Sequence, residues 1–217
     1  MQQLLEEDAR LIALLRAGDE AAFATLVERY QPAVLRLARM YVSRDLAEEI
    51  AQETWLAVLN SIDRFEQRAT LKSWILRIAM NKAKTLAKRE GRTIPFSALF
   101  ESATAPDDAA VGSARFLQHA AHGKPAGWWA DPPQRWSRSP EEMILATEVQ
   151  AVIHMAIARL AMNQREVITL RDIEGLDAKE VSMILEITDI NQRVLLHRAR
   201  AHVRRALEQY YAEGKRP

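Results

Sequence analysis

The sequence contains no cysteine, and this absence excludes several kinds of protein at once. A chain without thiols cannot be held together by disulfides, bind zinc through thiolates or use a cysteine nucleophile. Glycine is also scarce, with 7 in 217 residues, and neither a glycine-rich phosphate-binding loop nor a nucleophile elbow is present. We find no convergent acid–base pair and expect no bound cofactor or metal.

Long apolar runs are missing as well. None approaches the ~20 residues that a helix needs to cross a bilayer. The opening residues MQQLLEED are acidic and do not resemble a signal peptide. We therefore expect a soluble, cytoplasmic protein without membrane insertion. Apolar residues make up 48% of the chain, enough for real cores, and the length suits two small domains with a linker.

The net charge is only +1, but the charges are segregated along the chain. Residues 45–66 hold six acidic side chains and one basic, whereas residues 68–92 hold eight basic and one acidic. Residues 193–216 hold seven basic and two acidic side chains. This segregation predicts two kinds of partner surface.

The apolar pattern is helical nearly throughout and predicts an all-α fold. Six of the eight prolines lie between 91 and 140, which indicates a linker at 93–139 between domains at 1–92 and 140–217. In the first domain we expect helices at 11–17, 20–30, 32–41, 45–62 and 71–89. In the second we expect them at 140–160, 163–172, 178–186 and 189–211.

Caps and turn residues support these boundaries. Asp19, Thr70 and Thr188 can cap the helices that follow them, and Pro32 fits the first turn of a helix. Asn163 and Asp177 each have a glutamate three residues later, as in a capping box. We expect apolar inner faces on the helices at 45–62 and 71–89, formed by Ala51, Trp55, Val58, Leu59 and Ile62, and by Leu71, Trp74, Ile75, Ile78 and Leu86.

The segment 178–211 has the pattern of a helix–turn–helix. Gln192, Leu196 and Ala199 recur at helical spacing and should face inward, while Arg193, His197 and Arg200 fall on the opposite side. A recognition helix needs such a division, because one face packs and the other offers donors to bases and phosphates. A merely solvated amphipathic helix is the alternative.

Two faces of the first domain carry opposite charge. Arg77, Asn81, Lys84 and Lys88 share one face of the predicted helix at 71–89, beside a polar loop at 66–70 that could hold an unstacked base. A solvated face is the competing interpretation, and Trp74 suits a core better than a stacking platform. The predicted helix at 45–62 presents an acidic face that favours protein docking, formed by Asp45, Glu48, Glu49, Gln52 and Glu53. A metal site there would need ligands from another helix, and none is evident.

Three strings resemble the extracytoplasmic-function (ECF) group of bacterial RNA polymerase sigma factors. They are DLAEEIAQETWL at 45–56, LKSWILRIAMNKA at 71–83, and LHRAR at 196–200 after the helix–turn–helix. The resemblance covers about residues 9–92 and 140–211. It implies a sigma region 2-like bundle followed by a region 4-like helix–turn–helix domain.

The resemblance also implies a function: a sigma factor that binds core RNA polymerase, directs promoter-specific initiation and performs no catalysis itself. Core polymerase would dock on the acidic face of residues 45–53 defined above. Single-stranded −10 DNA would contact Gln67, Arg68, Thr70, Lys72, Arg77, Asn81, Lys84 and Lys88. The duplex −35 element would contact Asn191, Arg193, Val194, His197, Arg198 and Arg200. An anti-sigma factor is a usual partner in this family.

The chain departs from the family pattern in two places. Family members often have glycine where Glu186 stands, and the linker, with Trp128, Trp129 and Trp136, is longer than in the simplest members. Two other functions compete with a sigma factor. A conventional helix–turn–helix regulator would bind duplex DNA without polymerase, and a helical hydrolase would need a convergent polar site that the sequence does not show.

Overall fold

The computed structural model describes residues 2–90 and 140–212, and these residues form helices and no strands. The described residues divide into two compact units, which are treated separately below. The first unit comprises residues 2–90 together with 169–192, and the second comprises 140–168 together with 193–212. The predicted all-α fold is therefore confirmed, while the predicted linker at 93–139 falls outside the described residues.

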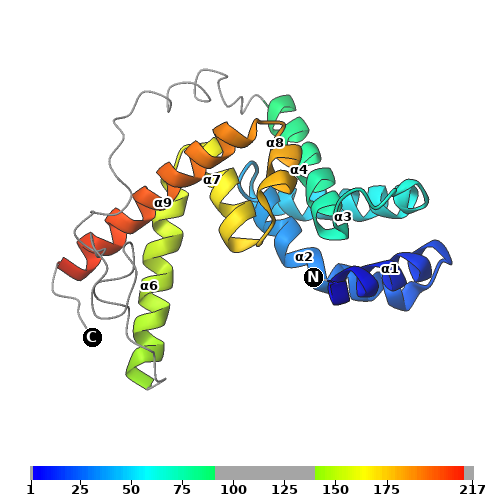
Figure 1. The fold of residues 1–217 in the computed structure, drawn as a ribbon, viewed down its shortest axis with the longest axis horizontal. Coiled ribbons are helices and arrows are strands. Elements are labelled where there is room, and N and C mark those ends of the chain that lie inside the picture. The colour runs from blue at the N-terminus through cyan, green and yellow to red at the C-terminus, as the bar shows by residue number, and fades with distance from the viewer. Residues whose placement is uncertain (1, 91–139, 213–217) are drawn as a thin grey trace, which may run out of the picture. The chain divides into compact units, whose positions relative to one another are not determined.

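The first unit is built on a helical bundle. It contains α1 (Gln2–Arg16), α2 (Glu20–Ala38), α3 (Arg44–Ser61), a 3-10 turn η1 (Ile62–Arg64), α4 (Leu71–Arg89), a π-helical segment η4 (Thr169–Ile173) and α8 (Ala178–Leu185). Helices α2, α3 and α4 pack against one another, α1 packs against α2 and η1, and α8 packs against α4 (Figure 1). Leu26, Leu37, Ile50, Ile75 and Met80 are completely or almost completely buried in its core.

Local sequence signals explain where these helices begin and end. Gly18 takes a positive φ of 78° after α1, a conformation that glycine adopts without steric cost. The Asp19 side chain then accepts a hydrogen bond from Ala22 N, and the Thr70 side chain accepts one from Ser73 N. Both predicted caps are confirmed.

One prediction for the first unit is wrong, and another is only partly confirmed. Pro32 does not begin a new helix but lies inside the continuous helix α2, which runs through residues 30–32. A proline inside a helix removes one hydrogen bond, but Tyr30, Ala33 and Val34 around it are buried, so packing on both sides outweighs that loss. In α4 the predicted inner residues Leu71 and Ile75 are buried, whereas Trp74, Ile78 and Leu86 are only half-buried. The buried stripe also contains Leu76, Ala79, Met80 and Ala83.

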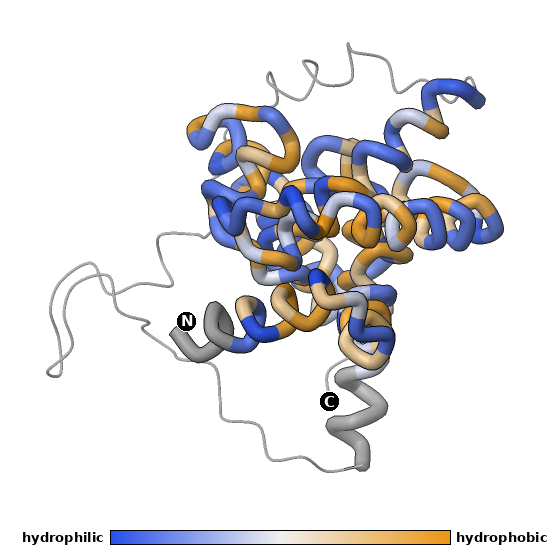
Figure 2. The backbone as a smooth tube through the Cα atoms, turned by 90° about the vertical axis from the view of Figure 1, so that its right-hand side faces the viewer, coloured by the Kyte–Doolittle hydropathy of each residue, from blue (hydrophilic) through white to orange (hydrophobic). Residues whose placement is uncertain are grey.

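The second unit contains α6 (Pro140–Ala158), α7 (Met162–Ile168) and residues 193–212 of α9 (Asp189–Ala212). The Tyr210 hydroxyl donates to Glu148 Oε2 at 2.7 Å and joins the end of α9 to α6. Asn163 lies within α7 rather than capping it, because its side chain accepts from the adjacent Gln164 N. Apolar and polar segments alternate along the helical tube in Figure 2, as amphipathic helices require.

Candidate nucleic-acid interface

A stacked pair of aromatic rings supports the loop between η1 and α4. The rings of Phe65 and Trp74 stack with centroids 4.7 Å apart and planes inclined by 29°. Arg16 of α1 donates to the carbonyl oxygens of Ile62 at 3.3 Å and Phe65 at 2.7 Å. Trp74 thus serves as a support for the loop, closer to the predicted core role than to a free stacking platform.

The loop residues themselves are accessible. Gln67 and Arg68 are exposed, and Gln67 takes a positive φ of 55° that turns the chain toward α4. Arg68 pairs with Glu66 at 2.6 Å, and both side chains remain mostly in solvent. Beside the loop lies a hollow of about 280 Å³, walled by the loop, by Trp74 and Arg77 of α4, and by Glu180, Met183 and Ile184 of α8.

The predicted basic row on α4 is only partly open to solvent. Asn81 and Lys88 are exposed, while Lys84 is half-buried with its ammonium 5.9 Å from the centre of the Tyr41 ring. Arg77 lies 3.4 Å from Glu186, and Lys72 forms an ion pair with Glu174 at 2.9 Å. The structure therefore brings part of the proposed DNA row against acidic side chains of residues 174–186.

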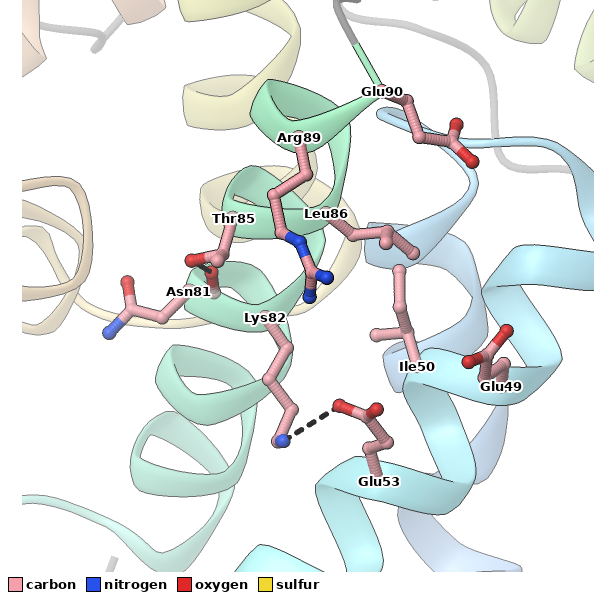
Figure 3. Close-up of a pocket in the computed structure, with 9 residues that line it drawn as sticks. All are labelled: Glu49, Ile50, Glu53, Asn81, Lys82, Thr85, Leu86, Arg89 and Glu90. Carbon is pink, nitrogen blue, oxygen red and sulfur yellow. Dashed lines mark hydrogen bonds and ion pairs between the residues drawn. The ribbon is translucent and has the colours of Figure 1, made fainter.

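The acidic residues of α3 form an exposed face. Asp45, Glu48, Glu49, Gln52 and Glu53 are all exposed, and they lie beside a groove of about 580 Å³ between α3 and α4. In that groove Lys82 donates to Glu53 at 2.9 Å, and Arg89 extends over it from α4 (Figure 3). Lys82 thus lies in the groove beside the acidic face, paired with one of its carboxylates.

Sequence reasoning missed two apolar residues on the same helix. Leu59 was expected on the inner stripe, but it is 43% exposed, and Leu56 is 60% exposed. Gln52, Leu56 and Leu59 are spaced by four and three residues, so they share one side of the helix with part of the acidic face. This spacing was the available signal. Exposed leucines beside carboxylates are typical of a protein-docking surface.

The helix–turn–helix signals are confirmed in detail. In α8 the Asp177 side chain accepts from Glu180 N at 2.8 Å, and the Glu180 side chain accepts from Asp177 N at 3.1 Å. Glu186, where glycine is frequent in the family, takes the left-handed conformation with φ 57°. The Thr188 hydroxyl caps α9 by accepting from Asn191 N at 3.2 Å.

The predicted division of α9 into two faces also holds. Gln192, Leu196 and Ala199 are buried. Asn191, Arg193, Val194, His197 and Arg200 are exposed, and Arg198 is half-buried. Ile190, which sequence reasoning passed over, is 76% exposed beside this set. Exposed apolar side chains on such a helix can contact the thymine methyl group in the major groove.

Other kinds of site find no support in the parts of the chain that the structure describes. Within residues 2–90 and 140–212, no group of three or more histidine or acidic side chains could hold a metal ion. Across the same ranges, no helix is both long and apolar enough to cross a membrane.

The two halves of the chain match two families of known domains. Residues 26–93 match sigma-70 region 2, and residues 150–203 match sigma-70 region 4. Together with the helical fold and the helix–turn–helix, these matches define a sigma-70 protein that carries regions 2 and 4.

Full-length relatives make the assignment more specific. The RNA polymerase sigma-H factor of Pseudomonas aeruginosa is 27% identical over 210 residues, covering 96% of this chain and 98% of that protein. The ECF RNA polymerase sigma-E factor of Haemophilus influenzae is 26% identical over 201 residues, covering 93% and 95%. The chain belongs to the ECF group of bacterial sigma factors and directs promoter-specific transcription.

Solved structures share the fold. One contains CnrH in complex with the cytosolic domain of CnrY, at 21% identity and a TM-score of 0.54, covering 93% of this chain and 97% of that chain. Another contains the sigma factor RpoE of Bartonella quintana in complex with the anti-sigma factor NepR, at 20% identity and a TM-score of 0.51, covering 86% and 96%.

Proposed function

We propose that different regions of this sigma factor perform different steps of promoter recognition. Residues 1–92 dock on core RNA polymerase and open the −10 element, residues 140–217 read the −35 element, and 93–139 link them. The chain acts in the cytoplasm as a non-catalytic specificity subunit. The observation that carries this proposal is the opposite chemistry of neighbouring faces in the first unit: exposed acids on α3 and exposed bases on α4.

Core polymerase binds the acidic face of α3. Glu49 and Glu53 are exposed there, and the apolar side chains of Leu56 and Leu59 lie on the same helix. Apolar contact supplies affinity, whereas the carboxylates orient a basic partner and exclude nucleic acid. A DNA-binding regulator without polymerase has no need for such a face next to a basic helix.

The loop and basic row hold the opened −10 strand. Each base-pair step that is melted costs ~1.4 kcal/mol in stacking. A base captured from solvent returns ~1–3 kcal/mol when it stacks in a pocket, and phosphate contacts add to this. The hollow beside Trp74 and Arg77 accepts the base, while Gln67, Arg68 and Asn81 contact the strand around it.

The −35 element binds the exposed face of α9. Arg193, His197 and Arg200 can reach base edges or phosphates, and Val194 can contact a thymine methyl group. A specific base contact is worth ~1–3 kcal/mol. An anti-sigma factor is a further partner, by analogy with the Bartonella quintana relative that was solved with one.

The test is reconstitution with bacterial core polymerase, followed by transcription from a library of genomic fragments. Promoter-specific transcripts that need both proteins are expected, and duplex binding without any polymerase dependence would instead indicate a conventional regulator. The double variant E49K/E53K should lose core binding in co-purification, whereas E28K, an exposed charge reversal on α2, should keep it. Undiminished core binding by E49K/E53K would reject the docking face.

A separate variant tests the assignment of the exposed α9 residues to the −35 element. R193A/R198A should lower transcription from a −35-dependent promoter by ~5–100-fold, since it removes one or two base or phosphate contacts. R159A removes an exposed arginine at the end of α6 and should leave transcription unchanged. Equal output from R193A/R198A and R159A would reject these positions.

A further inference from the structure

Helix α1 contacts both ends of the loop between η1 and α4, which we assign to −10 DNA. Near the end of α1, Arg16 donates from Nε to the Ile62 carbonyl oxygen at 3.3 Å and from Nη2 to the Phe65 carbonyl oxygen at 2.7 Å. Earlier on the same helix, the Asp8 carboxylate accepts a hydrogen bond from the backbone N–H of Leu71, the first residue of α4. One helix therefore contacts the backbone at the start and at the end of the loop.

The side chains that make these contacts lie on the packed face of α1. Asp8, Ile12, Leu15 and Arg16 are spaced by four, three and one residues, so they share one side of the helix. Ile12 and Leu15 are 2% and 6% exposed, and α1 packs against α2 and η1. Asp8 and Arg16 lie about 12 Å apart along the helix axis. Apolar packing thus fixes the helix, and its two polar side chains reach the loop from either end of the packed face.

Asp8 is a nearly buried carboxylate with partners on two other helices. Its side chain is 13% exposed, and its Oδ1 lies 3.9 Å from Nη1 of Arg29 on α2. Burial raises the pKa of Asp8, while Arg29 and the hydrogen bond from Leu71 oppose that rise. A buried carboxylate needs such partners. Asp8 therefore connects α1 to α2 and to the start of α4.

The backbone conformation of the loop also requires support from outside it. Gln67 has φ 55°, in the left-handed region that a residue with a Cβ atom rarely adopts. Such a conformation persists only where the surrounding structure holds it. The Phe65 ring is fixed by stacking on Trp74, and Thr70 caps α4. The hydrogen bonds from α1 fix the backbone on both sides of these loop residues.

We propose that Asp8 and Arg16 are positioning residues for −10 recognition, which hold the two ends of the loop so that Gln67 and Arg68 meet the strand in a preformed arrangement. Neither Asp8 nor Arg16 has to touch DNA. A preformed loop loses less conformational freedom on binding than a loop that the strand must order. The proposal rests on the proposed function of the loop and adds how its binding geometry is maintained.

The first test measures loop mobility in the free full-length protein and needs no promoter. The chain has no cysteine, so E66C carries a single thiol for a nitroxide spin label, on an exposed loop residue outside the assigned DNA contacts. Adding R16A should narrow the electron paramagnetic resonance lines, because the label then moves faster. Adding R10A, which removes an exposed arginine of the same helix, should leave them unchanged. Identical spectra for R16A and R10A would overturn the proposal.

The second test measures strand binding by holoenzyme formed with bacterial core polymerase. The probe is a fluorescent single-stranded oligonucleotide that carries the −10 element of a promoter recovered in the transcription test. R16A and D8A should weaken binding by about 5-fold or more, since apparent affinity falls with the fraction of loops in the binding conformation. D8N keeps an oxygen acceptor for the Leu71 amide and should recover much of the loss. R10A should bind like the parent protein.

Core binding separates positioning of the loop from a general loss of structure. R16A and D8A should co-purify with core polymerase as well as R10A does, because the acidic face of α3 is unchanged. If R16A lost core binding and strand binding to the same extent, its role would be merely structural and the proposal would be wrong. Strand binding by R16A equal to that by R10A would also reject it. A parent holoenzyme that binds no strand, with a loop that R16A still loosens, would refute the assignment of the loop to DNA and the proposal with it.

Discussion

The capping box of α8 allows the sharpest stability prediction. Asp177 accepts from Glu180 N at 2.8 Å, and Glu180 itself is 9% exposed. In D177A that amide loses its partner in a place that water reaches poorly. Loss of an N-cap lowers the unfolding free energy by ~0.5–2 kcal/mol. Because the amide of Glu180 is buried, we expect D177A to lose about 1–2 kcal/mol, the upper part of this range.

Urea unfolding followed by circular dichroism measures this cost. D177N is the matched control, because asparagine accepts the same hydrogen bond without the charge and should stay within about 0.5 kcal/mol of the parent protein. If D177A were as stable as D177N, the cap would contribute nothing. If both variants lost the same free energy, the charge at the helix N-terminus, rather than the hydrogen bond, would be the cause.

Three further predictions concern single side chains. Gln192 is 1% exposed, and its Nε2 has no hydrogen-bond partner among the described residues, so Q192M should raise the unfolding free energy by about 1 kcal/mol in urea titration. E186G should stabilise the protein by up to ~1 kcal/mol because φ is 57° there, and E186V should destabilise it by a larger amount. The hydrogen bond to Glu148 raises the pKa of Tyr210 from 10.0 to about 12, so its stabilisation is complete below pH 10 and is lost as the pH rises toward 12. Tyrosinate absorbance should show a late titration near pH 12 that Y210F removes.

The signals that could be interpreted from the sequence were local ones. Asp19, Thr70, Asp177 and Thr188 cap the helices that they were expected to cap, because a side chain three residues from an amide needs no distant partner. The inward face of α9 at Gln192 and its neighbours follows equally from helical spacing. The caps and faces of the candidate site were therefore predictable.

The predictions of helix boundaries and buried faces failed where packing against residues distant in the sequence determines the structure. Pro32 looked like a helix start, but the buried residues on either side keep α2 continuous. Leu59 fits the apolar period of α3 and yet is 43% exposed, since the described residues of the first unit cover it only partly. Periodicity identifies the apolar side of a helix, but the partner that covers it comes from elsewhere in the chain or from another molecule.

The contact of residues 174–186 with α4 shows a limit of reasoning from charge. Lys72 and Arg77 were assigned to DNA because a basic face suits a phosphate backbone. Glu174 and Glu186 satisfy the same donors, and nothing near either glutamate in the sequence indicates a cation about a hundred residues away. A basic face therefore predicts the chemistry of its ligand but not which of several acidic ligands occupies it.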